Sequence, residues 1–172
     1  METLQAIHRR RSVRAFTDKK VPEETLQQIL EAATWALSGH GRQSARLVCV
    51  TNREDRDALS RMNAAILGTP DADPFYGCPI VVVVLAHRCV PTHNYDGTLA
   101  AGTLMLAAAD AGVDSIWIHR AREEFDSPEG KALLEKWGLE GDYEGICHVL
   151  LGYSVDGHPQ PAPRRSDAIV RV

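Results

Sequence analysis

The chain is organised around one basic stretch near its start, His8-Arg9-Arg10-Arg11-Ser12-Val13-Arg14-Ala15-Phe16. Four arginines stand there within six residues, although the formal net charge of the whole chain is only -4. Leu4 and Ile7 have the spacing of one face of a short helix, so the arginines follow its C-terminal end, where the helix dipole tolerates cations. A phosphate would offset their mutual repulsion, because a guanidinium pairs with its oxygens and the Ser12 hydroxyl can donate to the same group. A solvated basic arm is the simpler interpretation, but Val13 and Phe16, which we expect to be buried, favour arginines held in fixed positions.

The composition is that of a globular protein with a real core. The 172 residues are 44% hydrophobic, and 23 acidic residues outnumber 19 basic ones, which argues against a broad nucleic-acid-binding surface. The longest apolar run, 80–86, is too short to span a bilayer. Residues 1–11 are polar and basic, unlike a signal peptide. We therefore expect a cytoplasmic protein with neither a nucleic-acid nor a membrane partner.

The cysteines and histidines form no recognisable metal or disulfide pattern. The four cysteines stand far apart, with no Cys-x-x-Cys pair and no histidine at metal-ligand spacing; they are Cys49, Cys78, Cys89 and Cys147. We expect reduced thiols, mostly buried in strands, and no metal site. A cysteine nucleophile stays open as an alternative without a supporting pattern.

Apolar periodicity predicts helices and strands in irregular alternation. Helices are expected from Pro22 along a stripe that reaches Leu37, over 53–66 behind an Asn52 cap, over 98–111, and from Ser127 to Gly138. Strands are expected at 47–51, 80–85, 115–118, 146–152 and 168–172. The run 80–85 predicts a strand buried on both faces, and the helix 98–111 is apolar almost all round, which predicts a buried helix. No Gly-x-Gly-x-x-Gly follows a strand, so the fold class is α+β and not a Rossmann fold.

Five segments in order resemble motifs of the nitroreductase family of flavoproteins, and together they span residues 3–170. They are the basic stretch 10–16, the loop 36–44, the segment 74–79, Asp96-Gly97 with 113–119, and 151–153 with Pro163-Arg164-Arg165. The resemblance implies a mixed, mainly antiparallel sheet flanked by helices. It implies a single domain over 1–172, in which 153–172 is an extended C-terminal arm whose last strand is exchanged in a homodimer.

The resemblance also implies an FMN site shared between two subunits. The phosphate would be held by Arg10, Arg11, Ser12 and Arg14, joined by Arg164 or Arg165, although the late pair could also be a solvated tail. The approaching loop would contribute Ser38, Gly39, His40, Arg42 and Gln43, and backbone groups around Ile118, His119 and Arg120 would bond the flavin ring. His40 and His119 could also be ordinary polar residues at a loop and a strand end. We nominate no catalytic acid or base, because the cofactor carries the redox chemistry.

The implied activity is an FMN-dependent oxidoreductase. NADH or NADPH would deliver a hydride, and a nitroaromatic, a quinone or a similar small acceptor would then take its place in a ping-pong scheme. Two alternatives stay open: a relative with different flavin chemistry, such as flavin destruction or dehalogenation, and a non-enzymatic protein that binds flavin or another phosphorylated ligand. Leu37 stands where the family usually has proline, and Gly41 where asparagine is common. These departures affect the expected substrate range more than the expected flavin binding.

Overall fold

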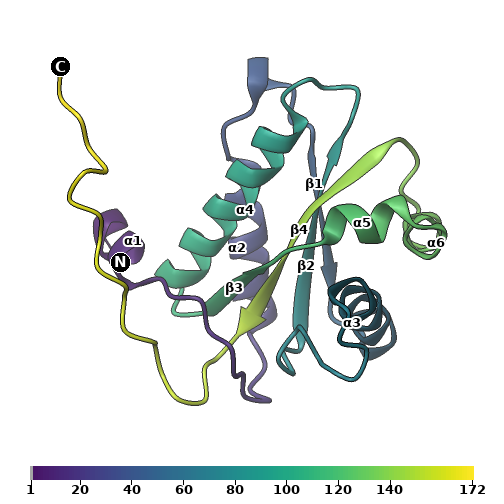
Figure 1. Ribbon diagram of the computed structural model, residues 1–172, viewed down its shortest axis with the longest axis horizontal. Helices are drawn as coiled ribbons and strands as arrows, with labels where there is room; N and C mark the ends of the chain where they lie inside the picture. Colours follow the sequence, from purple (N-terminus) through teal and green to yellow (C-terminus); the bar gives the residue numbers. More distant parts are fainter. Residues whose placement is uncertain (1) are drawn as a thin grey trace.

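The computed structural model describes residues 2–172 and has a four-stranded sheet between two layers of helices (Figure 1). Met1 lies outside the described residues. The strands are β1 (Ala45–Val50), β2 (Ile80–His87), β3 (Asp114–Ile118) and β4 (Tyr143–Gly152). They stand in the order β1-β2-β4-β3, and each neighbouring pair is antiparallel. The predicted α+β class with a mainly antiparallel sheet is confirmed.

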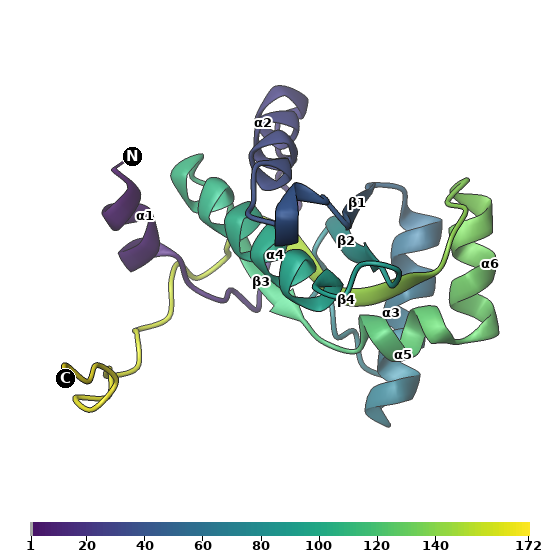
Figure 2. The same ribbon diagram turned by 90° about the horizontal axis from the view of Figure 1, so that it is seen from above.

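Two groups of helices cover the two faces of the sheet (Figures 1 and 2). One face carries α2 (Glu23–Thr34) and α4 (His93–Asp110), and the other carries α3 (Arg53–Leu67), α5 (Ala121–Asp126) and α6 (Pro128–Lys136). The short α1 (Thr3–Arg9) contacts α4 at one end of the molecule, and Ala6 is its one buried residue. A single 3-10 turn, η1 (Gly39–Gly41), precedes β1. Within the described residues, none of these helices has the length and apolar character needed to cross a membrane.

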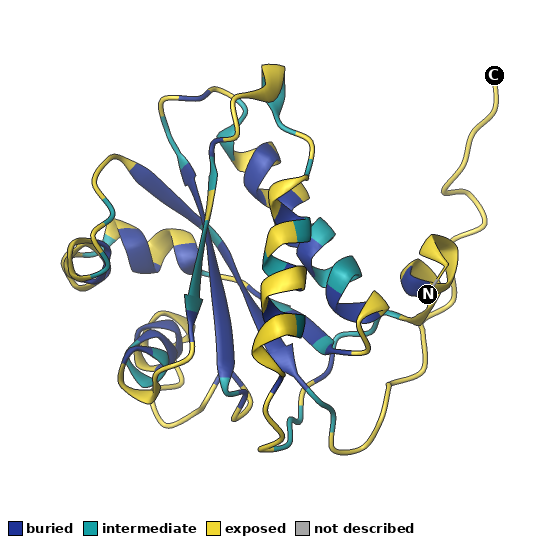
Figure 3. Ribbon diagram, turned by 180° about the vertical axis from the view of Figure 1, so that it is seen from behind, coloured by how far each residue is buried: buried dark blue, intermediate teal, exposed yellow. Residues whose placement is uncertain are grey.

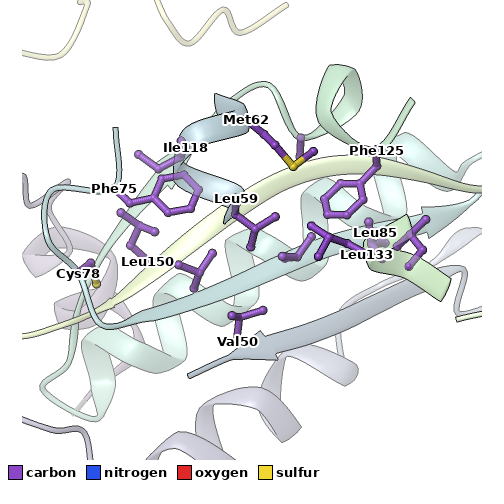
Figure 4. Close-up of a cluster of buried hydrophobic side chains, with 14 of the residues drawn as sticks. Val50, Leu59, Met62, Phe75, Cys78, Leu85, Ile118, Phe125, Leu133 and Leu150 are labelled. Atoms are coloured by element: carbon purple, nitrogen blue, oxygen red, sulfur yellow. The ribbon is translucent and has the colours of Figure 1, made fainter. Parts of the chain in front are cut away.

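Strand β2 carries the centre of the core. Successive side chains of a strand point to opposite faces, and here both faces are covered, so the apolar run has no polar side. Val81, Val83 and Leu85 pack toward α3, α5 and α6, in the cluster drawn in Figure 4, whereas Val82 and Val84 pack toward α2 and α4. Burying each such side chain contributes about 1.5 to 3 kcal/mol relative to leaving it exposed. The prediction of a strand buried on both faces is confirmed.

The caps of α3 and α6 were predictable, but α5 was not. The Asp55 N–H donates to the Asn52 side-chain oxygen over 2.9 Å, and the Gly130 N–H donates to the Ser127 hydroxyl over 3.0 Å, as the sequence predicted for these caps. Helix α5 depends instead on an irregularity between Val84 and Leu85 in the pairing of β2 with β4. At this point a Cβ on Gly145 would lie 2.1 Å from the Ala121 carbonyl oxygen, so only glycine lets α5 approach β4 this closely.

The two ends of the chain meet at the edge strand β3. Ser12 forms a parallel bridge with Ser115, and the Val13 N–H donates to the Ser115 carbonyl over 3.2 Å. The Thr17 N–H donates in turn to the Tyr153 carbonyl over 2.8 Å, which fixes the root of the C-terminal arm. Beyond this root, residues 155–172 are exposed and lead away from the sheet (Figures 1 and 3). Residues 168–172 form no strand within the protomer, and their exchange with a second subunit stays a prediction.

Two element predictions were wrong in detail. Helix α2 ends at Thr34, and Leu37, expected on its apolar stripe, is 78% exposed because the chain has already left the helix. Helix α4 begins at His93, earlier than expected, and it is not buried all round, since Leu99 is 45% exposed. One face of α4 is covered by the sheet and α2, and the sequence alone could not show that this chain leaves the other face open.

Candidate functional site

Six of the residues nominated from the sequence lie along the edge strand β3. The bridge between Ser12 and Ser115 lays the basic stretch beside this strand. Arg10 and Arg11 therefore come to the start of β3, where they line a small cavity together with Asp114 and Ser115. Farther along, Arg14, Ile118 and His119 line a second cavity of about 220 Å³ at the end of β3.

This second cavity, which we call the β3-end cavity, combines aromatic walls with positive charge. It is lined by Arg14, by Ile116 to Arg120 and by residues of the loop before β2, among them Tyr76. Tyr76 is an aromatic residue of this lining, and Arg14 and Arg120 carry guanidinium groups. A planar aromatic ligand that carries or develops negative charge suits such a lining. Tyr76 and Trp117 were not predicted to line a site, because nothing in the neighbouring sequence distinguishes them from aromatic residues that only pack in the core.

The arginines of the basic stretch are not neutralised by carboxylates. The Arg11 guanidinium donates to the carbonyls of His8 over 2.6 Å and Arg10 over 2.8 Å, and so closes the C-terminal end of α1. Arg14 makes only a long contact of 3.5 Å with the Ser12 carbonyl. Within residues 2–172, neither Arg10 nor Arg14 forms an ion pair with Asp or Glu. Their positive charge is therefore available to an external anion.

A buried hydroxyl lies at the same edge. Ser115 is 1% exposed, and its Oγ has no hydrogen-bond partner among the described residues. Buried polar atoms are seldom left without a partner, because desolvation without a compensating bond costs free energy. The Ser115 side chain lines the small cavity with Arg10 and Arg11, so an anion held by these arginines would meet a further donor there.

The loop 38–44 forms a second group of nominated residues, and Asp96 of α4 anchors it. One oxygen of Asp96 accepts from the Gly39 N–H over 2.9 Å and the other accepts from the Ser44 hydroxyl over 2.6 Å. Burial by itself raises the pKa of Asp96, but the hydrogen bonds from Ser44 and Gly39 outweigh it, and the pKa is lowered overall. A Cβ on Gly39 would lie 2.3 Å from the Thr92 hydroxyl oxygen, so this loop requires glycine where it meets α4.

This loop and the basic stretch lie at opposite edges of the sheet. The loop leads into β1, whereas the basic stretch runs beside β3, and two strands separate these edges. His40, Arg42 and Gln43 are exposed, and Ser38 and Gln43 also line a larger cavity of about 450 Å³ between α2, β1 and α4. One protomer therefore does not bring the loop to the arginines.

The late basic pair forms a third group. Arg164 and Arg165 lie on the exposed arm that leaves the body of the protomer (Figure 1). Arg165 pairs with Asp167 through two hydrogen bonds of 2.9 and 2.7 Å. Both partners are exposed, so this ion pair contributes little to stability and can open readily. Among residues 2–172, neither arginine lines the small cavity beside Arg10 or the β3-end cavity.

Backbone strain marks the same regions. Among the described residues, positive φ occurs outside glycine at His40, Gln43, Tyr76 and Arg120 only, with values of 52°, 49°, 51° and 81°. Two of these residues belong to the loop 38–44 and two line the β3-end cavity. Left-handed backbone is unfavourable for residues with a Cβ and collects at functional sites in proteins. The strain supports both regions as parts of a site, and no residue pattern in the sequence indicates it.

The cysteines do not add a nucleophile to either region. Cys78 and Cys147 are buried, Cys49 is partly buried, and Cys89 is exposed; all four are free thiols. Burial raises the pKa of Cys49 to about 11 and that of Cys78 to about 12, so both stay protonated at neutral pH. Within residues 2–172, no three side chains of His, Cys, Asp or Glu gather as a metal ion would require.

Comparison with known proteins finds one family that matches most of this chain. The family model described as Nitroreductase family matches residues 7–153. A curated protein of Archaeoglobus fulgidus, provisionally named NADH dehydrogenase/NAD(P)H nitroreductase, is 30% identical over 164 residues, which cover 90% of this chain and 87% of that protein.

Solved structures agree with this family match. A nitroreductase with bound FMN from Bacteroides fragilis NCTC 9343 superposes with a TM-score of 0.90 at 28% identity and covers 100% of this chain and 99% of its own. A second nitroreductase with bound FMN, from Desulfitobacterium hafniense DCB-2, gives a TM-score of 0.87 at 29% identity, with 100% and 98% covered.

Proposed function

Since this chain belongs to the nitroreductase family, we propose that it is an FMN-dependent oxidoreductase that takes its electrons from NADH or NADPH. The two FMN-bound nitroreductases with TM-scores of 0.90 and 0.87 support the cofactor, and the name of the Archaeoglobus fulgidus relative supports the donor. Nitroaromatics, quinones or similar small molecules are the acceptors that we propose. The donor and the acceptor occupy the same place over the bound ring in turn, which makes the scheme ping-pong.

The groups along β3 fit FMN. Arg10 has no acidic partner within residues 2–172, and the buried Ser115 hydroxyl in the same small cavity lacks a partner in that range, so a phosphate there would pair with both. The ring system suits the aromatic and cationic lining of the β3-end cavity. In the proposed complex, Arg10, Arg11, Ser12 and Arg14 hold the phosphate and ribityl chain, and backbone groups of Ile118, His119 and Arg120 bond the ring.

When bound, FMN supplies two-electron redox chemistry. The protein side chains contribute orientation and electrostatics. Arg14 and Arg120 place positive charge in the β3-end cavity, which favours negative charge on a bound ring. Tyr76 would limit the access of water and offer a flat surface to an aromatic partner. Because the cofactor carries the redox chemistry, we assign no catalytic acid or base.

We further propose that the active unit is a homodimer in which a second subunit completes each site. In one protomer the loop 38–44 and the arm with Arg164 and Arg165 stand away from the β3 edge. Several large apolar side chains on α1, α2, α4 and the arm are open to solvent; they are Leu4 (70%), Trp35 (82%), Leu99 (45%), Ile169 (80%) and Val170 (80%). A second copy that covers them would bring its own loop and arm to the arginines.

The arginines without acidic partners beside the orphaned Ser115 hydroxyl are the observation that carries the proposed function. Titration of the purified protein with FMN, followed by quenching of flavin fluorescence, tests it. We expect saturable binding of one FMN per chain. A protein that quenches no FMN fluorescence at any ratio would contradict the proposed function and also the alternative of a non-enzymatic flavin-binding protein.

A further inference from the structure

A buried polar network lies directly beneath the turn between β3 and α5. Its members are Asn63 of α3, Glu124 of α5 and His148 of β4, and each of the three is 0% exposed. Charged and polar groups are rarely buried so completely, and an apolar set of similar volume would fill the same space without the desolvation penalty. The phosphate and ring contacts proposed above use none of these three residues.

Asn63 links this network to the β3-end cavity. Its side-chain amide donates one hydrogen bond to the His119 carbonyl over 2.8 Å and another to Glu124 Oε1 over 2.5 Å. Its oxygen accepts from the Arg120 guanidinium over 3.4 Å. Turning the amide over would set its oxygen against two acceptors, so the orientation is determined by its partners. The Asn63 dipole therefore lies between the cation of Arg120 and the carboxylate of Glu124.

The inner end of the network is the contact between His148 and Glu124. His148 Nε2 lies 3.0 Å from Glu124 Oε2, and its ring packs beside Phe75 and Phe125 with centroids 5.2 and 6.2 Å away. His148 Nδ1 is buried and has no hydrogen-bond partner among the described residues. A bare lone pair at Nδ1 is less costly there than an unpaired N–H, so Nε2 is assigned as the donor to Glu124. Asn63 then connects this pair to Arg120.

The turn that this network holds is itself strained. Arg120 has a φ of 81°, a left-handed conformation that a residue with a Cβ adopts only when its surroundings require it. The neighbouring His119 carbonyl is fixed by Asn63, and the Arg120 carbonyl accepts from the Glu124 N–H over 3.1 Å. Both His119 and Arg120 line the β3-end cavity. The strained turn therefore holds the backbone of His119 and Arg120, and the Arg120 side chain, at the cavity.

We propose that Asn63, Glu124 and His148 are positioning residues, which hold the turn at His119 and Arg120 and thereby fix the Arg120 guanidinium at the edge of the cofactor. This inference rests on the proposed function, since it assigns the network to an FMN site. The network acts through Arg120: a fixed cation at the ring favours the negative charge that accompanies reduction. Its loss weakens FMN binding and makes the bound flavin harder to reduce.

Two variants and one matched control test the proposal. Asn63→Leu removes the bridge at nearly constant volume, and Arg120→Gly removes the guanidinium where glycine relieves the left-handed strain. The control is Asp55→Asn on the same helix α3; Asp55 is 4% exposed and accepts from Lys136 and Trp137, away from the cavity. For each protein we would measure the FMN dissociation constant, the midpoint potential of bound FMN, and amide hydrogen exchange of residues 119–122 without FMN.

We expect both variants to bind FMN about tenfold more weakly, as the loss of one charge-assisted contact would cause, and to shift the midpoint potential to more negative values. Asn63→Leu should also accelerate exchange at 119–122, whereas Asp55→Asn should lower thermal stability and leave all three readings at their parent values. Parent-like affinity and potential in Asn63→Leu would overturn the proposal. If Asn63→Leu does not fold, parent-like affinity and potential in Arg120→Gly would overturn it equally.

The same experiment separates this inference from the proposed function. A parent protein that binds no FMN would refute the FMN site, and the role of the network at that site would fail with it. Faster exchange in Asn63→Leu would then establish only that the network holds the turn. A parent protein that binds FMN while both variants bind it equally well would refute the positioning role and leave the proposed function standing.

Discussion

Single arginines of the basic stretch differ in what they already contact. The Arg11 guanidinium donates hydrogen bonds to the carbonyls of His8 and Arg10. Arg14 contacts only the Ser12 carbonyl, over 3.5 Å, and it is exposed beside the β3-end cavity. An arginine without internal partners loses little when an anion binds it. We therefore expect Arg14 to contribute more to FMN affinity than Arg11 does.

Substitution of Arg14 tests its contact with the phosphate. Arg14→Ala should weaken FMN binding about ten- to a hundredfold, which corresponds to the loss of one charge-assisted hydrogen bond. Riboflavin lacks the phosphate, so the substitution should weaken riboflavin binding less than FMN binding. The control is Arg53→Ala, because Arg53 is exposed on α3 and pairs only with Asp57 among the described residues. An equal loss for riboflavin and FMN would contradict the phosphate role of Arg14.

At the residue scale, the sequence predicted which residues carry charge but not which of them meet. Buried Val13 was predictable, and with it the fixed course of the basic stretch. The nominated Arg10, Ser12, Arg14 and His119 do lie along one strand edge, but they do so through the bridge between Ser12 and Ser115, a non-local pairing that no local pattern specifies. The left-handed turn at Arg120 was equally unpredictable, because arginine has no preference for that conformation.

At the element scale, the anchoring of the loop 38–44 to helix α4 has a consequence for pH. The folded protein lowers the pKa of Asp96, so its carboxylate stabilises the fold above the unfolded pKa of about 3.9. This stabilisation is lost as the pH falls through the lowered folded pKa. Asp96→Asn should cost about 1 to 3 kcal/mol of unfolding free energy at neutral pH, because Gly39 and Ser44 lose a charged acceptor.

Denaturant unfolding of the parent and Asp96→Asn at neutral and at acid pH measures this effect. The difference in unfolding free energy between the two proteins should shrink as the pH approaches the folded pKa from above. A difference that stays constant over this range would show that the charge of Asp96 does not stabilise the loop. Asp57→Asn is a suitable control, because Asp57 is partly exposed and its partners are the exposed Arg53 and the partly buried Arg56, away from the loop.

Elements with strong local signals were predictable, and those defined by packing were not. Strand β2 and the Asn52 cap follow from apolar periodicity and from a side chain that accepts a backbone N–H. The position of helix α5 depends on Gly145 of β4, which has no side chain and so permits the close approach of Ala121. Helix α2 stops at Thr34 although the apolar spacing continues to Leu37, because the chain must turn into the loop anchored by Asp96.

At the scale of the whole molecule, the exposed arm and the separated groups of site residues lead to one expectation. Deletion of residues 166–172 removes Ile169 and Val170, each 80% exposed in the protomer, and should weaken the proposed dimer. Because the partner's arm also brings Arg164 and Arg165 to the site in our proposal, FMN affinity should fall together with dimerisation. Sedimentation and FMN titration of the truncated protein measure the two effects. A monomeric truncated protein with full FMN affinity would contradict a site shared between subunits.

The sequence could indicate the proposed homodimer only indirectly. The arm's three prolines and its apolar last residues predicted an extended segment that needs an external partner, and the protomer leaves that segment exposed. The apolar character of α4 is a second such indication, since Leu99 is 45% exposed in the protomer. Local patterns show that a surface is apolar, but which surface covers it depends on the partner.

The central claim, an FMN-dependent oxidoreductase that uses NADH or NADPH, is tested most directly by anaerobic reduction of the FMN-loaded protein. NADH and NADPH are added separately, and the visible absorbance band of bound oxidised FMN is followed. We expect at least one of the two donors to bleach the band, and addition of a quinone or nitroaromatic to restore it. A band that persists with both donors, yet is bleached by dithionite, would contradict the claim and identify a protein that binds FMN without this activity.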